Sequence, residues 1–310
     1  MVVVLAGGTG GAKLAAGMYD LLADGELTVI ANTGDDVEVH AVHVSPDPDL
    51  VTYRLAGLLD DRGWGIRGDT WQVMDALEAA GRPVWFRLGD RDLALCLVRT
   101  ELLRAGKRLT EAHAAVVEAC GVRAPVLPMS DDPVRTWVRS RGEWLELQRF
   151  LILEGGAAPV EDVEPRGASE AAPTPDALAA VEGADAIVIG PSNPVISIGP
   201  ILALRGMRDA LTAAHAPVVA VSPFVGGGVL KGPTAAFMEH EGLDRSAAGV
   251  VAAYRGLLDG IVTDESADAL GVPALRTDTL MDGPEAARRL ADEVLGFASG
   301  LGASAPTRKP

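Results

Sequence analysis

An apolar run followed by a glycine-rich turn at the start of the chain constrains the fold most strongly. Val2–Ala6 contains only apolar residues, and Gly7–Lys13 then reads GGTGGAK. This order predicts a buried β-strand, a tight turn and the start of a helix. Glycines let backbone N–H groups come close to a ligand, and the helix N-terminus adds positive potential. The turn is therefore predicted to hold a phosphate or diphosphate; the alternative is a tight turn that binds nothing.

The turn matches neither of two standard nucleotide-binding motifs. A Walker loop requires Gly-Lys followed by Ser or Thr, whereas Lys13 lies between Ala12 and Leu14. The dinucleotide fingerprint requires G-x-G-x-x-G, and counting from Gly8 puts Lys13 where the third glycine belongs. We interpret this lysine as a sign of phosphates that react, in contrast to a dinucleotide that only docks.

The composition of the chain narrows the range of partners. Its 310 residues are 48% hydrophobic, which is enough for a large α/β core. The formal net charge of -16 argues against nucleic acid and anionic membranes, because phosphate-rich surfaces require a basic partner. The sequence has no run of about 18 apolar residues to span a membrane. No leader-like segment precedes the first predicted strand, so we expect a cytoplasmic protein.

The cysteines and histidines lack the spacing of metal ligands. Cys96 and Cys120 lie in helix-like stretches, and we expect both to be buried free thiols. We expect all five histidines to be non-catalytic; these are His40, His43, His113, His215 and His240.

Acidic residues follow the second predicted strand. After Leu27–Ala31, the segment Asn32–Asp36 reads NTGDD, and Ser45–Asp49 reads SPDPD before a helix predicted from near Leu50. Carboxylates from separate chain segments beside a phosphate turn favour Mg²⁺, which one or two carboxylates hold together with substrate phosphates. The alternatives are a solvated turn for the first pair of acids and a helix cap for the last one.

The middle of the chain carries tryptophans and an interruption of the βα rhythm. Trp64 and Trp71 lie in a glycine-rich loop, where they either plug the edge of the core or stack on a flat ligand. Val134–Leu153 alternates apolar and polar residues around Arg141-Gly142, which predicts an antiparallel hairpin. The other predicted elements are helices over Gly10–Ala23, Trp71–Ala80, Gly89–Ala105 and Thr110–Cys120, and strands over Val84–Leu88 and Val126–Met129.

Three further strands are predicted in the second half, over Ala186–Ile189, Pro217–Val221 and Gly260–Thr263. Each is followed by Gly, Ser, Asn or Asp, and ligands of parallel sheets lie outside the carboxyl ends of the strands. We therefore predict an α/β, Rossmann-like fold with a mostly parallel sheet and helices on both faces. It forms one domain over residues 1–299, with an inserted helical and hairpin region over about 90–175 and a flexible tail over 300–310.

The loops together resemble the 2-phospho-L-lactate transferase family of coenzyme F420 biosynthesis, which in actinobacteria is called phosphoenolpyruvate transferase. The resemblance covers almost the whole chain, with the motifs in the same order. The matching segments are Gly7–Leu14, Asn32–Asp36, Ser45–Asp49, Trp64–Thr70, Leu88–Asp92, Leu127–Val134, Gly190–Leu202, Ser222–Pro233 and Asp278–Met281.

The resemblance implies a specific reaction. A phospholactyl or phosphoenolpyruvyl group moves from a guanylylated, GDP-like donor to the ribityl hydroxyl of 7,8-didemethyl-8-hydroxy-5-deazariboflavin (Fo). GMP leaves, and the reaction requires Mg²⁺. The resemblance also implies a homodimer. Phosphoryl transfer of this kind depends on positioning and charge neutralisation.

The resemblance also implies roles for individual residues. Asp35 and Asp49 are expected to hold the metal. Asp49, or alternatively Asp36, is expected to take the proton of the acceptor hydroxyl, and Lys13 to assist the departure of GMP. The expected acceptor-binding residues are Asn32, Asp49, Trp64, Arg87 and Leu88. The expected donor-binding residues are Gly7, Gly8, Thr9, Gly10, Gly11, Lys13, Ser192, Asn193 and Pro194, with Gly226 and Lys231 as a second anion contact.

Three other functions remain open at the level of the sequence. A related gluconeogenesis-factor-like regulator would share the glycine opening and bind a nucleotide sugar without transferring it. An NAD-dependent oxidoreductase would need the missing third glycine and a proton relay. A nucleotide sensor without activity would bind the donor but release no GMP. The donor itself, phosphoenolpyruvyl, phospholactyl or phosphoglyceryl, is left open because no residue distinguishes them.

Overall fold

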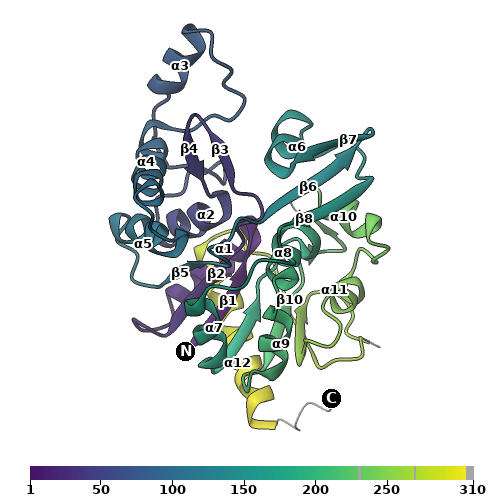
Figure 1. The fold of residues 1–310 in the computed structure, drawn as a ribbon. Helices are drawn as coiled ribbons and strands as arrows, with labels where there is room; N and C mark the ends of the chain where they lie inside the picture. The colour runs from purple at the N-terminus through teal and green to yellow at the C-terminus, as the bar shows by residue number, and fades with distance from the viewer. Residues whose placement is uncertain (230–231, 269, 305–310) are drawn as a thin grey trace.

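A parallel β-sheet forms the centre of the computed structural model, which describes residues 1–229, 232–268 and 270–304 and within them shows seven strands in this sheet (Figure 1). The spatial order is β14-β13-β10-β9-β1-β2-β5, and every adjacent pair is parallel. Counted along the chain from β5, this is 3-2-1-4-5-6-7, which extends the Rossmann order. The strands are β1 (Val2–Ala6), β2 (Leu27–Ala31), β5 (Val126–Pro128), β9 (Ala186–Ile189), β10 (Val218–Val221), β13 (Gly260–Thr263) and β14 (Ala274–Arg276).

Apolar side chains on both faces explain why these strands lie in the middle of the molecule. Along β1, Val3 and Leu5 belong to one apolar cluster, whereas Val4 belongs to the cluster on the other face, as the alternation of side chains along a strand requires. The first cluster includes residues of α7 (Pro175–Glu182), α9 (Met207–Ala213) and α11 (Ala247–Ala253); the second includes α1 (Gly8–Tyr19) and α12 (Pro284–Ser304). The predicted α/β fold with helices on both faces is confirmed.

Two insertions flank β5. Between β2 and β5 the chain forms β3 (Val37–Val39), β4 (Val42–Val44), α2 (Pro46–Leu55), α3 (Gln72–Ala79), α4 (Asp90–Arg104) and α5 (Leu109–Ala119). Between β5 and β9 it forms β6 (Arg135–Ser140), β7 (Glu143–Glu146), α6 (Leu147–Leu153), β8 (Asp162–Arg166) and α7. The predicted insertion over about 90–175 therefore includes a strand of the main sheet, and the inserted structure begins well before residue 90.

The predicted hairpin is confirmed and is larger than expected. β6 pairs with β7 around Arg141 and Gly142, both at positive φ, and β8 adds to the other edge of β6. Residues from Leu147 onward form α6, so the hairpin ends at Glu146. In Figure 1 this small sheet and α6 stand beside the main sheet, at the end opposite the chain termini.

One predicted strand is wrong. Val84–Leu88 is a loop. Its Val84, Trp85, Phe86 and Leu88 pack in a small apolar cluster with the strands β3 and β4 and residues of α3 and α4. A short apolar run does not distinguish a strand from a loop that is buried in a local cluster.

The remaining helices agree with the sequence prediction within a few residues, with one difference that affects the site. The helix expected from near Leu50 begins at Pro46, so Asp47 and Asp49 lie in its first turn. A proline in the first turn suits a helix start. The helix α12 continues to Ser304, so the first residues of the predicted tail are helical, and 305–310 lie outside the described residues.

The other elements of the second half are the π-helix η1 (Pro194–Ile198), α8 (Gly199–Ala203), β11 (Phe224–Val225), β12 (Gly228–Val229) and α10 (Thr234–His240). Across the described ranges, no helix combines the length and apolar character needed to cross a membrane.

Candidate active site

A cleft of about 710 Å³ lies at the carboxyl ends of the central strands. Gly7 and Gly8 follow β1, and Pro191 and Ser192 follow β9, and all four line it. The strand order reverses between these two neighbouring parallel strands, because the chain adds β2 and β5 on one side of β1 and β9 on the other. Doubly wound sheets bind ligands at such a switch point. The volume is typical of a small-molecule site. The predicted donor residues on its wall are Gly7, Gly8, Thr9, Gly10, Lys13, Ser192 and Asn193.

The glycines of the turn serve the packing of the protein as well as its ligand. A Cβ on Gly10 would lie 2.0 Å from the carbonyl oxygen of Pro191, and one on Gly11 would lie 2.7 Å from Oγ of Ser192. Gly8 has a φ of 66°, a backbone conformation that favours glycine. The turn therefore needs glycine because the loop after β9 approaches it closely. Gly11, Pro194 and Gly226 are not among the described cleft-lining residues, and Lys231 lies outside the described residues.

Two buried carboxylates, Asp35 and Asp47, line the cleft. Asp47 Oδ1 accepts from the backbone N–H of Gly8 at 2.6 Å, and its Oδ2 accepts from Nδ2 of Asn32 at 2.9 Å. Asp35 Oδ2 accepts from Nε2 of Gln148 at 2.9 Å. Its Oδ1 is buried without a hydrogen-bond partner among the described residues. A buried polar atom left in this way is costly unless something binds it.

Burial and neighbouring negative charges raise the pKa of both carboxyl groups. Burial raises the pKa of Asp47 to about 6, although the hydrogen bonds from Asn32 and Gly8 favour its charged form. Burial, and then the charges of Asp47 and Asp36, raise the pKa of Asp35 well above its usual range. Two carboxylates that disfavour each other's charge gain most from a bound cation. Their oxygen ligands suit a hard divalent ion such as Mg²⁺.

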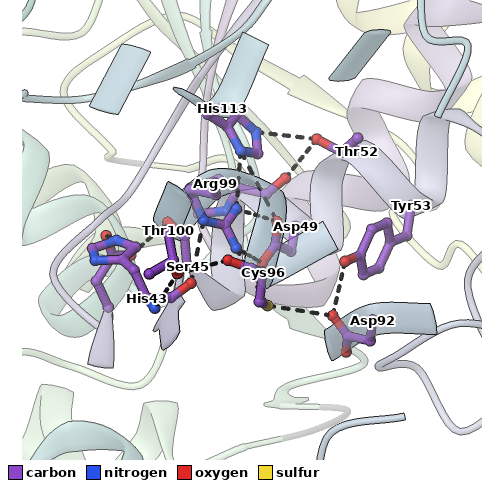
Figure 2. A network of polar contacts seen from close by, with 12 residues as sticks. His43, Ser45, Asp49, Thr52, Tyr53, Asp92, Cys96, Arg99, Thr100 and His113 are labelled. Atoms are coloured by element: carbon purple, nitrogen blue, oxygen red, sulfur yellow. Dashed lines mark hydrogen bonds and ion pairs between the residues drawn. The ribbon is translucent and has the colours of Figure 1, made fainter. Parts of the chain in front are cut away.

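Asp49, the expected metal ligand, has a different partner in the structure. Both of its carboxylate oxygens accept from the guanidinium of Arg99 at 2.7 Å (Figure 2). The Arg99 side chain is fully buried and also reaches Nδ1 of His113 at 3.3 Å. Asp49 is not among the described residues that line the cleft. Asp47 of the same SPDPD segment, which was not among the expected metal ligands, is the carboxylate of this helix turn that lines the cleft.

Asp36, the alternative proton acceptor, is also engaged inside the protein. Its Oδ1 accepts from Oγ of Ser45 at 2.6 Å, and its Oδ2 lies 2.9 Å from Nε2 of His43. Burial disfavours the charged form of His43, but the hydrogen bond and charge of Asp36 outweigh it and raise the His43 pKa. Like Asp49, Asp36 is not among the described residues that line the cleft.

A second group of possible metal ligands lies beside the Arg99 pair. Single ligand atoms of Asp49, Asp92 and Cys96 lie within 4.8 Å of one another. The guanidinium of Arg99 already neutralises Asp49, and Asp92 accepts from the hydroxyl of Tyr53 at 2.8 Å. Burial raises the pKa of the Cys96 thiol well above its usual range, and a metal requires the thiolate. These contacts are typical of a structural polar network and not of a metal site.

The expected acceptor residues differ in their distance from the cleft. Asn32 contacts its wall through the hydrogen bond to Asp47. Trp64 is 51% exposed and contacts Trp71 with ring centroids 6.3 Å apart. Its neighbour Gly63 and Arg67 of the same loop line the cleft. Arg87 pairs with Asp75 and Glu78 on the surface. Leu88 is buried in the cluster around β3 and β4. The Trp64 loop, but neither Arg87 nor Leu88, is brought next to the cleft.

Two arginines on the cleft wall were missed from the sequence. Arg54 and Arg67 both line it, together with the acidic Asp60 and Asp61. Arg54 follows Asp47 by seven residues in α2, which places both on one face of the helix. That spacing would have identified Arg54 if the helix had been predicted to begin at Pro46.

The fold and the cleft together define the class of protein. It is a Rossmann-like α/β protein with a ligand cleft at the switch point of its sheet, where a glycine turn meets a pair of buried carboxylates. Solved structures of this shape are known. A Bacillus halodurans protein superimposes with a TM-score of 0.62 at 17% identity, over 95% of this chain and 98% of its own. This likeness concerns the fold alone.

Sequence comparison identifies the family. The family model described as "2-phospho-L-lactate transferase CofD" matches residues 2–277. A 2-phospho-L-lactate transferase of Methanosarcina acetivorans is 40% identical, covering 96% of this chain and 98% of its own. One of Methanopyrus kandleri is 42% identical (95% and 96%), and a phosphoenolpyruvate transferase of Streptomyces griseus is 38% identical (96% and 98%). The chain belongs to the 2-phospho-L-lactate transferase family, as its loops indicated.

The buried ion pair yields a stability prediction. Replacing Arg99 with Met leaves the carboxylate of Asp49 buried and unpaired, and this is expected to cost about 3–5 kcal/mol of the free energy of unfolding. The double variant Arg99→Met/Asp49→Leu removes both charges and is expected to recover most of that loss. Urea unfolding of the three proteins measures this. Equal losses in the single and double variants would contradict the account of the pair.

The raised pKa of Asp47 yields a pH prediction. Because its folded pKa of about 6 exceeds the ordinary 3.8, the folded state binds the proton more tightly than the unfolded chain. The resulting stability is present below about pH 4 and is lost as the pH rises through 6. With a chelator present, the Asp47 carboxyl is expected to lower the free energy of unfolding of the wild type by about 1–3 kcal/mol across this window. Asp47→Asn is expected to show a flatter slope in urea unfolding from pH 4 to 7, and an unchanged slope would contradict the assignment.

Proposed function

We propose that this protein is a Mg²⁺-dependent transferase of coenzyme F420 biosynthesis. It moves a phospholactyl or phosphoenolpyruvyl group from a guanylylated donor to the ribityl hydroxyl of Fo and releases GMP. The observation that carries the proposal is the Asp35–Asp47 pair beside the Gly7–Lys13 turn. Relatives named 2-phospho-L-lactate transferase and phosphoenolpyruvate transferase, which match nearly the whole chain, support it.

The residues present fit a divalent cation. Asp35 offers Oδ1, which has no partner among the described residues, and Asp47 offers a second carboxylate on the same cleft wall. When bound there, Mg²⁺ would neutralise the negative charge of the donor phosphates and of the departing GMP. These two carboxylates replace the expected pair of Asp35 and Asp49.

The other parts of the cleft have complementary roles in the proposal. Lys13 lies on the wall and donates from Nζ to the carbonyl oxygen of Met281 at 2.6 Å. This contact orients the ammonium group beside the turn, where it can contact a phosphate. Arg54 and Arg67 supply further positive charge on the wall. Leu147, Leu151 and Ile196 give it an apolar side, which suits an uncharged ring system.

The covalent step needs little from the protein beyond position. The acceptor hydroxyl oxygen forms a bond to the phosphorus of the transferred group, and the bond from that phosphorus to the GMP oxygen breaks. The hydroxyl proton passes to a base. Asp49 and Asp36 are both engaged by other side chains, so we no longer assign either of them this role.

Subunit number and location are further parts of the proposal. We propose a homodimer on the basis of the family resemblance, and a cytoplasmic location as expected from the sequence. The nucleotide-sugar-binding regulator without transferase activity stays as the alternative, and turnover distinguishes it from the transferase.

Turnover with defined substrates tests the proposal. The purified protein is incubated with Fo and each guanylylated donor, with and without Mg²⁺, and GMP and the product are quantified by mass spectrometry. We expect Mg²⁺-dependent release of one GMP per product. Asp47→Asn is expected to lower kcat/KM at least about 100-fold, because a charge-stabilising group in the transition state is removed.

Asp176→Asn is the matched control. Asp176 also lies in the first turn of a helix that begins with proline, α7, but it is exposed on the surface. Its replacement is expected to leave turnover within twofold of the wild type. Binding of a nucleotide ligand without GMP release from any donor would favour the regulator.

A further inference from the structure

The small β6–β7–β8 sheet holds the turn that carries Asp35. The backbone N–H of Thr136 in β6 donates to the carbonyl oxygen of Gly34 at 2.5 Å. Gly34 in turn accommodates this contact, because a Cβ there would lie 2.7 Å from Oγ1 of Thr136. The inserted sheet therefore contacts the backbone one residue before the carboxylate.

The helix α6, which lies between β7 and β8 in the chain, contacts the carboxylate itself. Gln148, in the first turn of α6, donates from Nε2 to Oδ2 of Asp35 at 2.9 Å, across 113 residues of sequence. Its neighbours Leu147 and Leu151 line the cleft. Gln148 is thus the link between the inserted sheet and the acidic pair on the cleft wall.

The hydrogen bond from Gln148 gives the two carboxylate oxygens of Asp35 different roles. Oδ2 is held by the amide, and Oδ1 is the buried oxygen without a partner among the described residues. An amide is a neutral donor, so it orients the carboxylate without competing for its negative charge. Groups that orient a metal ligand in this way typically change metal affinity 10–100-fold when removed.

We propose that Gln148 is a positioning residue that orients Asp35 for a divalent cation in the cleft. The inference rests on the proposed Mg²⁺-dependent function and adds to it a residue from the inserted sheet region. It predicts that cation binding depends on α6, although α6 contributes no ligand of its own.

Direct Mn²⁺ binding, without substrates, tests the proposal. Free Mn²⁺ is measured by its electron paramagnetic resonance signal at fixed pH for the wild type, Gln148→Met and Gln148→Asn. We expect Gln148→Met, which keeps the size of the side chain but cannot donate, to weaken Mn²⁺ binding about 10–100-fold. In Gln148→Asn, which keeps the amide but is one methylene shorter, we expect a loss as well.

The control is Arg149→Met in the same helix. Arg149 pairs with Glu146 and lies over the ring of Trp85. This variant is expected to bind Mn²⁺ within twofold of the wild type. In turnover, Gln148→Met is expected to raise the Mg²⁺ concentration for half-maximal rate while kcat at saturating Mg²⁺ changes less than threefold.

The outcomes separate the two proposals. Wild-type Mn²⁺ affinity in folded Gln148→Met or Gln148→Asn would overturn the role of Gln148 and leave the metal site standing. Absence of stoichiometric Mn²⁺ binding by the wild type would overturn the proposed metal site, and the role of Gln148 with it.

Discussion

The buried ion pair between Arg99 and Asp49 determines how the rest of the site is arranged. Arg99 comes from α4 and Asp49 from the first turn of α2, and His113 of α5 lies against the same guanidinium (Figure 2). Buried charges are expensive to desolvate, so the pair is stable only in one geometry. That geometry fixes the start of α2, where Asp47 lies two residues before Asp49. The network behind the cleft therefore positions the carboxylate inside it.

The site is assembled from segments that are far apart in the sequence. β1 supplies the glycine turn, the segment after β2 supplies Asp35, and α2 supplies Asp47, whose carboxylate accepts from the N–H of Gly8. The helix α6, from the insertion between β5 and β9, supplies Gln148. The contact between Gly8 and Asp47 requires the first insertion to be folded on the main sheet. The contact between Asp35 and Gln148 requires the second. Residues of both insertions therefore line the cleft, among them Arg54 of the first and Leu147 of the second.

The sequence predicted the sheet well and the cleft only in part. Continuous apolar strands and polar strand ends identify a parallel sheet and its binding edge, whatever the details of packing. The choice between Asp47 and Asp49 depends on helix phase, because residues two apart in an α-helix point about 200° away from each other. Predicting the helix from near Leu50 left that phase unknown. The strand predicted over Val84–Leu88 was wrong for a related reason, because tertiary packing alone decides whether a short apolar segment joins the sheet or a local cluster.

The central claim is that the divalent cation is held by Asp35 and Asp47, while Asp49 serves the protein's own architecture. Anomalous diffraction from crystals of the protein soaked in Mn²⁺ tests it most directly. We expect an anomalous peak in contact with both carboxylates of the cleft, with the Arg99–Asp49 pair intact. A peak among Asp49, Asp92 and Cys96, with Arg99 displaced, would contradict it.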